Sequence, residues 1–148
     1  MRNVILDQII EIIDREGDMT LATLRPDGYP QANIVSYVND GMTLYFGTSE
    51  ESQKAKNIAF EEKVSVSINA PRKGWTEIES VSLGGSASVI KDPDEHESVR
   101  QLLFSKYPEI AAYAPSTDQE ALLYRIDPVV LTLLDYTRGF GFTKTISV

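Results

Sequence analysis

The chain has 148 residues, with 14 Lys and Arg against 22 Asp and Glu, which gives a formal net charge of −8. This length is typical of one domain, and a hydrophobic content of 42% is typical of a folded globular protein. The acid excess argues against a nucleic-acid binder that neutralises phosphates. The absence of Cys excludes disulfides and thiolate chemistry, and the single His96 excludes any mechanism needing two imidazoles from one chain.

The N-terminal residues predict no targeting segment. Apolar Val4, Ile5 and Leu6 are followed at once by Asp7, so this run is too short for a signal-peptide core. No stretch approaches the ~20 apolar residues of a membrane span. We therefore expect a cytoplasmic protein with neither a membrane nor a nucleic-acid partner.

The first 60 residues predict a helix, three strands and a second helix. Residues 3–17 have helical spacing of apolar positions, with Asn3 as N-cap and Gly17 as the stop. Strands are predicted over 20–25, 31–38 and 42–48, separated by turns at 26–28 and 39–41. Short strands joined by tight turns indicate an antiparallel meander. Residues 49–60 then predict a helix.

The remaining residues predict further strands around one helix. Residues 64–69 alternate with a period of two, and 77–90 form a long strand in which Gly84-Gly85 indicates a bulge. Asp92 and Pro93 begin a helix that extends to about residue 107. The last two predicted strands, 122–126 and 129–136, are separated by Asp127-Pro128. We expect one domain over 1–148, mainly β within the α+β class: six antiparallel strands in a small barrel with flanking helices.

The segment 44–58 is the most informative candidate site. A strand ends near Gly47, hydroxyl residues follow, and a helix begins, which is an arrangement suited to a phosphate. Thr48, Ser49 and Ser52 could donate hydrogen bonds, and Lys54 carries a positive charge. The structural alternative is a capping box from Thr48 to Glu51 with an ion pair between Glu50 and Lys54. Because such boxes are common, the residues alone favour this alternative.

A family resemblance favours the phosphate interpretation. The runs 19–24, 27–30, 44–58 and 64–68, in this order and spacing, resemble the pyridoxamine 5′-phosphate oxidase-like FMN-binding split-barrel family. The resemblance is good over about residues 3–90 and looser beyond them. It implies a six-stranded split barrel that forms a homodimer and holds FMN at the dimer interface.

The resemblance also implies which residues hold the cofactor. The segment that grips the flavin phosphate corresponds to Thr48, Ser49, Ser52, Gln53 and Lys54. The strand whose backbone edge contacts the isoalloxazine ring corresponds to Asn33, Ile34, Val35 and Ser36. Gln53 and Asn33 stand where the oxidases carry Arg, and Val38 stands where they carry Lys. Losing a charge-assisted hydrogen bond costs ~1.5–3 kcal/mol, so these replacements weaken the expected grip on FMN.

Trp75 is the only Trp and follows the basic loop 72–74. The resemblance suggests that this loop approaches the flavin, from the other subunit of the dimer. The alternative is that Trp75 is an interface or core anchor, since Trp buries a large area and is enriched at interfaces.

The expected function is that of an FMN-binding flavoprotein, an oxidoreductase with a small-molecule redox substrate. The C-terminal region lacks the Arg and His arrangement that the oxidases use for the substrate's phosphate, so a true pyridoxamine 5′-phosphate oxidase is not expected. No catalytic side chain is assigned, because the flavin carries the redox chemistry. His96 lies in an acidic helical turn typical of a solvated His, so no metal site is expected. The alternatives are a non-catalytic flavin-binding or sensor module, or an F420 or haem binder on the same barrel.

Overall fold

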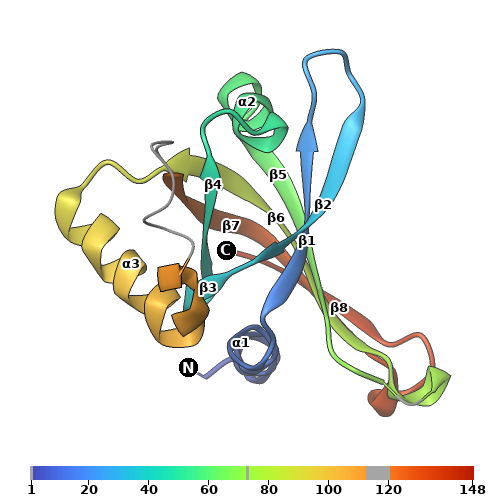
Figure 1. Cartoon of the computed structure of the whole chain (residues 1–148). Helices are drawn as coiled ribbons and strands as arrows, with labels where there is room; N and C mark the ends of the chain where they lie inside the picture. The colour runs from blue at the N-terminus through green and yellow to red at the C-terminus, as the bar shows by residue number, and fades with distance from the viewer. Residues whose placement is uncertain (1, 73, 113–120) are drawn as a thin grey trace.

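The computed structural model describes residues 2–72, 74–112 and 121–148 (Figure 1). Three α-helices and eight strands make up the described fold, with short 3₁₀ segments between them. In chain order they are α1 (Val4–Arg15), β1 (Asp18–Leu24), β2 (Pro30–Ser36), β3 (Val38–Asp40), β4 (Thr43–Ser49), α2 (Gln53–Phe60), β5 (Lys63–Asn69), η1 (Trp75–Glu77), β6 (Glu79–Val89), α3 (Pro93–Lys106), η2 (Pro108–Ala112), β7 (Ala121–Asp135), η4 (Tyr136–Arg138) and β8 (Thr143–Ser147).

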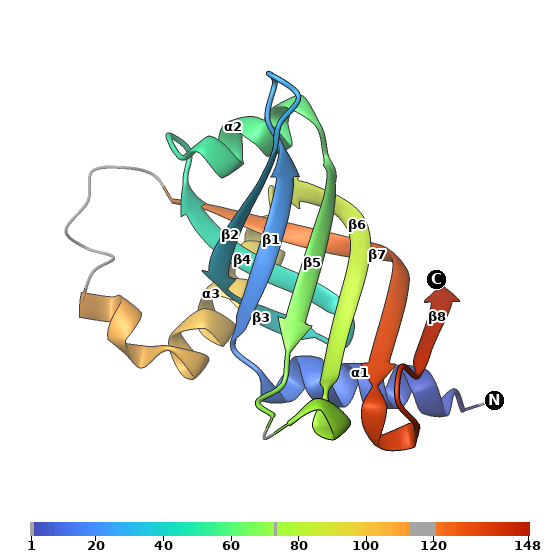
Figure 2. The ribbon, with the colours of Figure 1, turned by 90° about the vertical axis from the view of Figure 1, so that its right-hand side faces the viewer.

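The strands form one antiparallel sheet with the order β2-β1-β5-β6-β7-β4-β3, and β8 pairs with β7 beside this path. The two ends of the path, β2 and β3, are separated in sequence by Tyr37 alone. The sheet must therefore curl back on itself, although β2 and β3 do not pair. Figure 2 shows the curled sheet with α1 across one end and α2 near the other. The predicted mainly-β split-barrel fold is confirmed, with eight strands in the described residues where six were expected.

Tyr37 interrupts the strand predicted over 31–38. Its side chain is fully buried, and its hydroxyl donates to the carbonyl of Ile13 at 2.6 Å. Its backbone N–H donates to the carbonyl of Gly17 at 3.0 Å. Burial raises the pKa of Tyr37, so the phenol stays protonated as a donor at neutral pH. Tyr37, which separates β2 from β3, is thus hydrogen-bonded to Ile13 of α1. The next residue, Val38, begins β3 and pairs with Tyr45 of β4.

The helices differ in how much they contribute to the core. In α1, Asn3 accepts from the N–H groups of Ile5 and Leu6, both at 3.1 Å, as the N-cap prediction requires. Its residues Ile9, Ile12 and Ile13 are buried against the sheet, whereas α3 buries only Val99. No helix within the described residues is long and apolar enough to cross a membrane.

The bulge predicted at Gly84-Gly85 is confirmed, because the register between β6 and β7 shifts between these two glycines. The prediction of two strands around Asp127-Pro128 is wrong, since β7 continues through both residues. On its other edge, β7 pairs with β4 up to Ile126 and with β8 from Val130 onwards. Pro128 lies between these two partners, where a residue without an N–H is tolerated. The strand β8 was not predicted.

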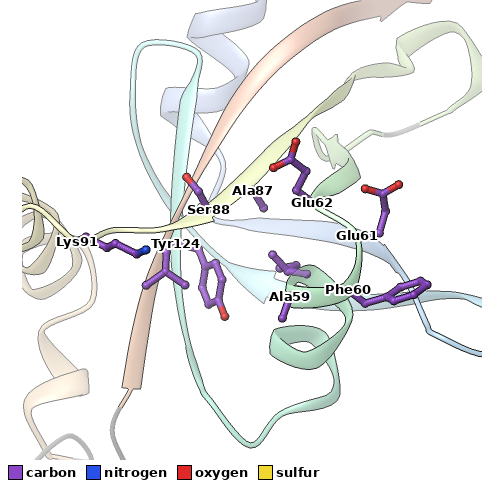
Figure 3. Close-up of a pocket in the computed structure, with 10 residues that line it drawn as sticks. Ala59, Phe60, Glu61, Glu62, Ala87, Ser88, Lys91 and Tyr124 are labelled. Atoms are coloured by element: carbon purple, nitrogen blue, oxygen red, sulfur yellow. The ribbon is translucent and has the colours of Figure 1, made fainter.

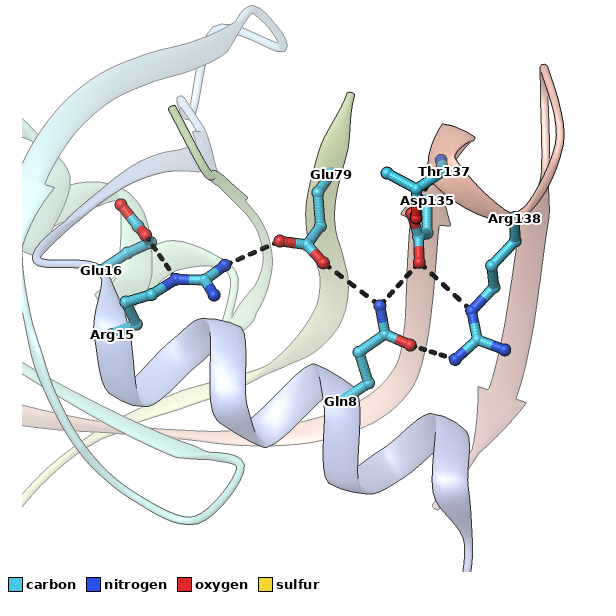
Figure 4. Close-up of polar contacts among 7 residues, drawn as sticks. All are labelled: Gln8, Arg15, Glu16, Glu79, Asp135, Thr137 and Arg138. Carbon is cyan, nitrogen blue, oxygen red and sulfur yellow. Dashed lines mark hydrogen bonds and ion pairs between the residues drawn. The ribbon is translucent and has the colours of Figure 1, made fainter. Parts of the chain in front are cut away.

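A polar network fastens α1 to the ends of β6 and β7 (Figure 4). The amide nitrogen of Gln8 donates to Asp135 at 2.8 Å and to Glu79 at 3.2 Å. Arg15 donates to the other oxygen of Glu79 at 2.7 Å, and Arg138 donates to both Asp135 and Gln8. Asp135 is only 3% exposed, so its charge depends on these donors.

The network predicts a pH-dependent contribution of Asp135 to stability. Burial alone raises the pKa of Asp135, but hydrogen bonds from Thr137, Gln8 and Arg138 outweigh it and lower the pKa. We expect Asp135→Asn to lower the free energy of unfolding at pH 7 by about 1–2 kcal/mol. The folded-state pKa lies below the unfolded value of about 3.9, so the wild-type advantage is complete above that value and is lost as pH falls through the folded pKa. Urea unfolding of both proteins across this range measures the difference; a constant difference down to acid would contradict the assignment.

Candidate functional site

A mainly apolar pocket of about 380 Å³ lies between β2, β4 and the C-terminal end of α3. Pockets of this size are typical of small-molecule sites. It brings together predicted site residues from two separate segments, namely Val35 and Ser36 of β2 and Thr48 and Ser49 of β4. The remaining lining residues in the described ranges are Gly47, Leu103, Tyr107, Ile110, Ala121 and Leu123.

Strand β2 contributes an unpaired backbone edge beside this pocket. It pairs only with β1, so its second edge has no strand partner among the described residues. Val35 is buried, whereas Ile34 is 77% exposed and does not line the pocket. Asn33 is half-buried and lies opposite Leu21 of β1. Only the C-terminal part of the predicted 33–36 segment therefore reaches the pocket with its side chains.

The turn from β4 into α2 contains the predicted hydroxyl cluster. Ser52 is the N-cap of α2; its Oγ accepts from the N–H of Ala55 at 3.2 Å and from the hydroxyl of Thr48 at 2.9 Å. Ser49 Oγ accepts from the N–H of Glu51 at 3.2 Å. Ser49 and Ser52 thus act as acceptors here, and among the described residues neither donates its hydroxyl hydrogen. Two hydroxyl donors remain for a ligand.

Neither the predicted capping box from Thr48 to Glu51 nor the predicted ion pair between Glu50 and Lys54 is formed. The predicted helix over 49–60 begins at Gln53, and its cap is Ser52, so Thr48 and Glu51 form no capping box. Lys54 is half-buried and has no carboxylate within ion-pair distance among the described residues, so the expected pair with Glu50 is not formed. The charge of Lys54 therefore has no partner in the described part of the chain.

Asn57 holds α2 against the sheet, and the sequence pattern did not indicate this role. It is fully buried, and its amide nitrogen donates to Thr23 at 2.9 Å and to Gln31 at 3.0 Å. Its amide oxygen accepts from Gln53 at 2.9 Å. Gln53, a predicted phosphate contact, is thereby engaged within α2. The signal in the sequence was a polar residue between the apolar positions Ala55 and Ile58.

The link from Asn57 to Thr23 predicts a measurable loss of stability. Replacing Thr23 by Val keeps the side-chain shape and removes one acceptor from a buried amide. We expect the free energy of unfolding to fall by about 1 kcal/mol. Thr20→Val is the matched control, because Thr20 is half-buried on the same strand and its hydroxyl makes no hydrogen bond among the described residues; it is expected to change this free energy by less than about 0.5 kcal/mol. Equal effects in urea unfolding would show that the hydrogen bond is unimportant.

Trp75 does not line this pocket. It is 69% exposed on η1, and the Arg72 guanidinium stacks 5.2 Å from its ring centroid. A core-anchor role is therefore wrong. β5 separates this loop from α2, and seven residues of strand span ~20 Å. Within one chain, the structure does not bring Trp75 and the hydroxyl cluster together.

Comparison with known proteins gives relatives of low sequence identity and high structural similarity. General stress protein 26 from Bacillus subtilis is 26% identical over 85 residues, which cover 57% of this chain and 59% of that protein. A heme-binding protein from Mycobacterium smegmatis superposes with a TM-score of 0.84 at 21% identity, covering 99% of this chain and 59% of that one. The heme storage protein HutZ from Vibrio cholerae gives 0.70 at 19% identity, covering 86% and 91%.

Because the identities to the two solved structures are this low, those structures establish only the fold of this chain. This chain also spans only 59% of the length of both the curated relative and the Mycobacterium protein. The family is established by sequence. A family model described as pyridoxamine 5′-phosphate oxidase matches residues 5–135, which are most of the chain and include both walls of the pocket from β2 and β4. The chain therefore belongs to the pyridoxamine 5′-phosphate oxidase family.

Proposed function

We propose that this chain binds FMN, with the flavin ring at the pocket between β2 and β4 and the phosphate at the start of α2. One observation carries the proposal: the apolar pocket ends at Thr48 and Ser49, directly before a Ser52-capped helix whose Lys54 has no carboxylate partner among the described residues. FMN has the complementary chemistry, since it joins a flat, largely apolar ring to a phosphate dianion. A helix N-terminus and hydroxyl donors suit that phosphate.

The proposed phosphate contact must act locally. A net charge of −8 gives an anionic ligand no long-range attraction to the protein. The positive end of α2, the hydroxyl hydrogens of Ser49 and Ser52, and the ammonium of Lys54 therefore provide the attraction. Gln53 adds no charge, so Lys54 is the principal cation in this proposal.

The bound flavin would supply hydride or electron transfer, which makes the protein an oxidoreductase acting on a small-molecule redox substrate. In this proposal the chain binds and orients the ring, and the free edge of β2 at residues 33–36 offers backbone hydrogen-bond groups to it. A homodimer is part of the proposal, because Trp75 is exposed and does not line the pocket of its own chain. A second subunit would allow this residue to cover the partner's pocket.

Haem is the second candidate, because two of the structurally similar proteins are named as haem-binding or haem-storage proteins. The described lining of the pocket offers no imidazole or thioether as an axial ligand. His96 lies in the first turn of α3, whereas the pocket contacts the C-terminal end of that helix. These positions favour the flavin.

The decisive experiment is to identify the molecule that co-purifies with the protein, by absorption spectrum and mass, and to titrate the stripped protein with FMN, F420 and haem. We expect FMN to bind most tightly, at one per chain. Tighter binding of haem or F420 would overturn the proposal. Reduction of the bound flavin by NAD(P)H and reoxidation by air support the oxidoreductase, whereas a flavin that no donor reduces supports a binding or sensor module. Native mass spectrometry tests the dimer.

A further inference from the structure

A second pocket, of about 520 Å³, lies between the C-terminal half of α2 and strands β6 and β7 (Figure 3). It shares no lining residue with the pocket between β2 and β4. Its lining includes the apolar residues Ala59 of α2 and Ala87 of β6. This pocket adjoins the end of α2 opposite the proposed phosphate contact, so the FMN proposal does not account for it.

Tyr124 places an unpaired hydroxyl at this pocket. The residue is only 2% exposed, and its ring stacks on Phe46 with centroids 5.0 Å apart and planes 8° from parallel. Among the described residues its hydroxyl has no hydrogen-bond partner, although it lines the pocket (Figure 3). No side-chain N or O atom of the described residues is both buried and without a hydrogen-bond partner, so this hydroxyl is open to the pocket and can donate to a ligand there. Burial, with a contribution from Glu50, raises the pKa of Tyr124, so the group remains a neutral hydroxyl at pH 7.

The two ends of the pocket carry opposite charges. Lys91 lies at the same end as Tyr124, and Ser88 lies close by on β6 (Figure 3). Glu61 and Glu62 lie at the other end, where α2 finishes. The last turn of α2 contains no basic residue, so the negative end of the helix dipole adds to these carboxylates.

We propose that this second pocket binds a small amphoteric molecule, with its ammonium group at Glu61 and Glu62 and its carboxylate at Lys91 and the Tyr124 hydroxyl. The apolar middle of the molecule packs on Ala59 and Ala87. This arrangement pairs the charged groups at each end of the pocket with an opposite charge and gives the Tyr124 hydroxyl an acceptor. A ligand carrying only one charge leaves one wall unmatched, and a dianion is opposed by the two carboxylates.

The test uses the full chain as purified, labelled for amide NMR, and four probes: ε-aminocaproate, γ-aminobutyrate, hexylamine and hexanoate. We expect ε-aminocaproate to shift the amide signals of Ala59, Ala87 and Tyr124 saturably, and to bind about 10-fold more tightly than either single-charge probe. The shorter γ-aminobutyrate also carries both charges and should bind more tightly than either single-charge probe. Equal affinity for all four probes, or no shift at these amides, would overturn the proposal.

Variants separate a specific site from general charge attraction. Tyr124→Phe keeps the stack on Phe46 and should weaken ε-aminocaproate about 3- to 10-fold. Lys91→Gln should reduce the affinity for ε-aminocaproate to the level that the wild-type protein shows for hexylamine. Lys56→Gln removes a charge from an exposed position of α2 outside the pocket and should leave the affinity unchanged. Urea unfolding of each variant identifies any loss of fold. Equal affinities of the Tyr124→Phe and Lys56→Gln variants for ε-aminocaproate would contradict the contact assigned to the Tyr124 hydroxyl.

Discussion

Replacing Gly85 by Ala is expected to lower the free energy of unfolding by about 3 kcal/mol, at the upper end of the usual cost of overpacking. A Cβ at Gly85 would lie 2.5 Å from the carbonyl oxygen of Asp127 and 3.1 Å from its carbonyl carbon. These are backbone atoms of β7, which is paired with β4 directly before this point and with β8 soon after it. The strand cannot move away from the new methyl group without disturbing those pairings.

Gly84→Ala is the matched control for this prediction. Its Cβ would meet only the side chain of Val130, at 3.2 Å, and that side chain can adjust. We expect a loss of less than about 1 kcal/mol, partly offset by the lower unfolded-state entropy of Ala. Urea unfolding measured at 25 °C distinguishes the variants. Similar stabilities would show that the close approach of β6 to β7 at Gly85 does not constrain the fold.

The bulge illustrates what the sequence alone can predict about this fold. Two adjacent glycines within a long apolar alternation predict an irregular strand, because few other causes place a Gly pair there. The backbone that they approach could not be predicted, since Asp127 is far along the chain. The sequence also predicts two strands separated by Asp127-Pro128, because the strands that pair with β7 on either side of Pro128 cannot be seen in it. Pro signals the lack of an N–H, but only the positions of β4 and β8 reveal that no N–H is needed at this point.

The candidate site shows the same limit at the start of α2. Thr48, Ser49 and Ser52 are all good N-cap residues, so local propensity does not decide which of them begins the helix. The pairing of Ser49 with Ala121 extends β4 through residue 49 and leaves Ser52 as the cap. The family resemblance predicted Val35, Ser36, Thr48 and Ser49 as site residues, and the fold brings these four to one pocket. Neither local propensity nor the family resemblance indicated Asn57 or Tyr124, because the roles of these two residues depend on their burial in the fold.

Replacing Lys54 by Ala is expected to weaken FMN binding about 10- to 100-fold, which corresponds to the loss of one charge-assisted hydrogen bond. Riboflavin has the same ring without the phosphate, so its affinity should change little. The free energy of unfolding should also change little, because Lys54 has no carboxylate partner among the described residues that would be left unpaired. Fluorescence titration of the stripped protein with both flavins measures the two affinities directly.

Lys56→Ala provides the control, since Lys56 is an exposed lysine of the same helix, one position from the buried Asn57. It changes the net charge by the same amount and should leave both affinities within about twofold, because a surface charge is largely screened at physiological salt. If Lys54→Ala weakens FMN and riboflavin equally, the residue supports the pocket without contacting phosphate. If it weakens neither, the helix N-terminus and the hydroxyls of Ser49 and Ser52 hold the phosphate without it. An effect on FMN alone assigns the ammonium of Lys54 to the phosphate.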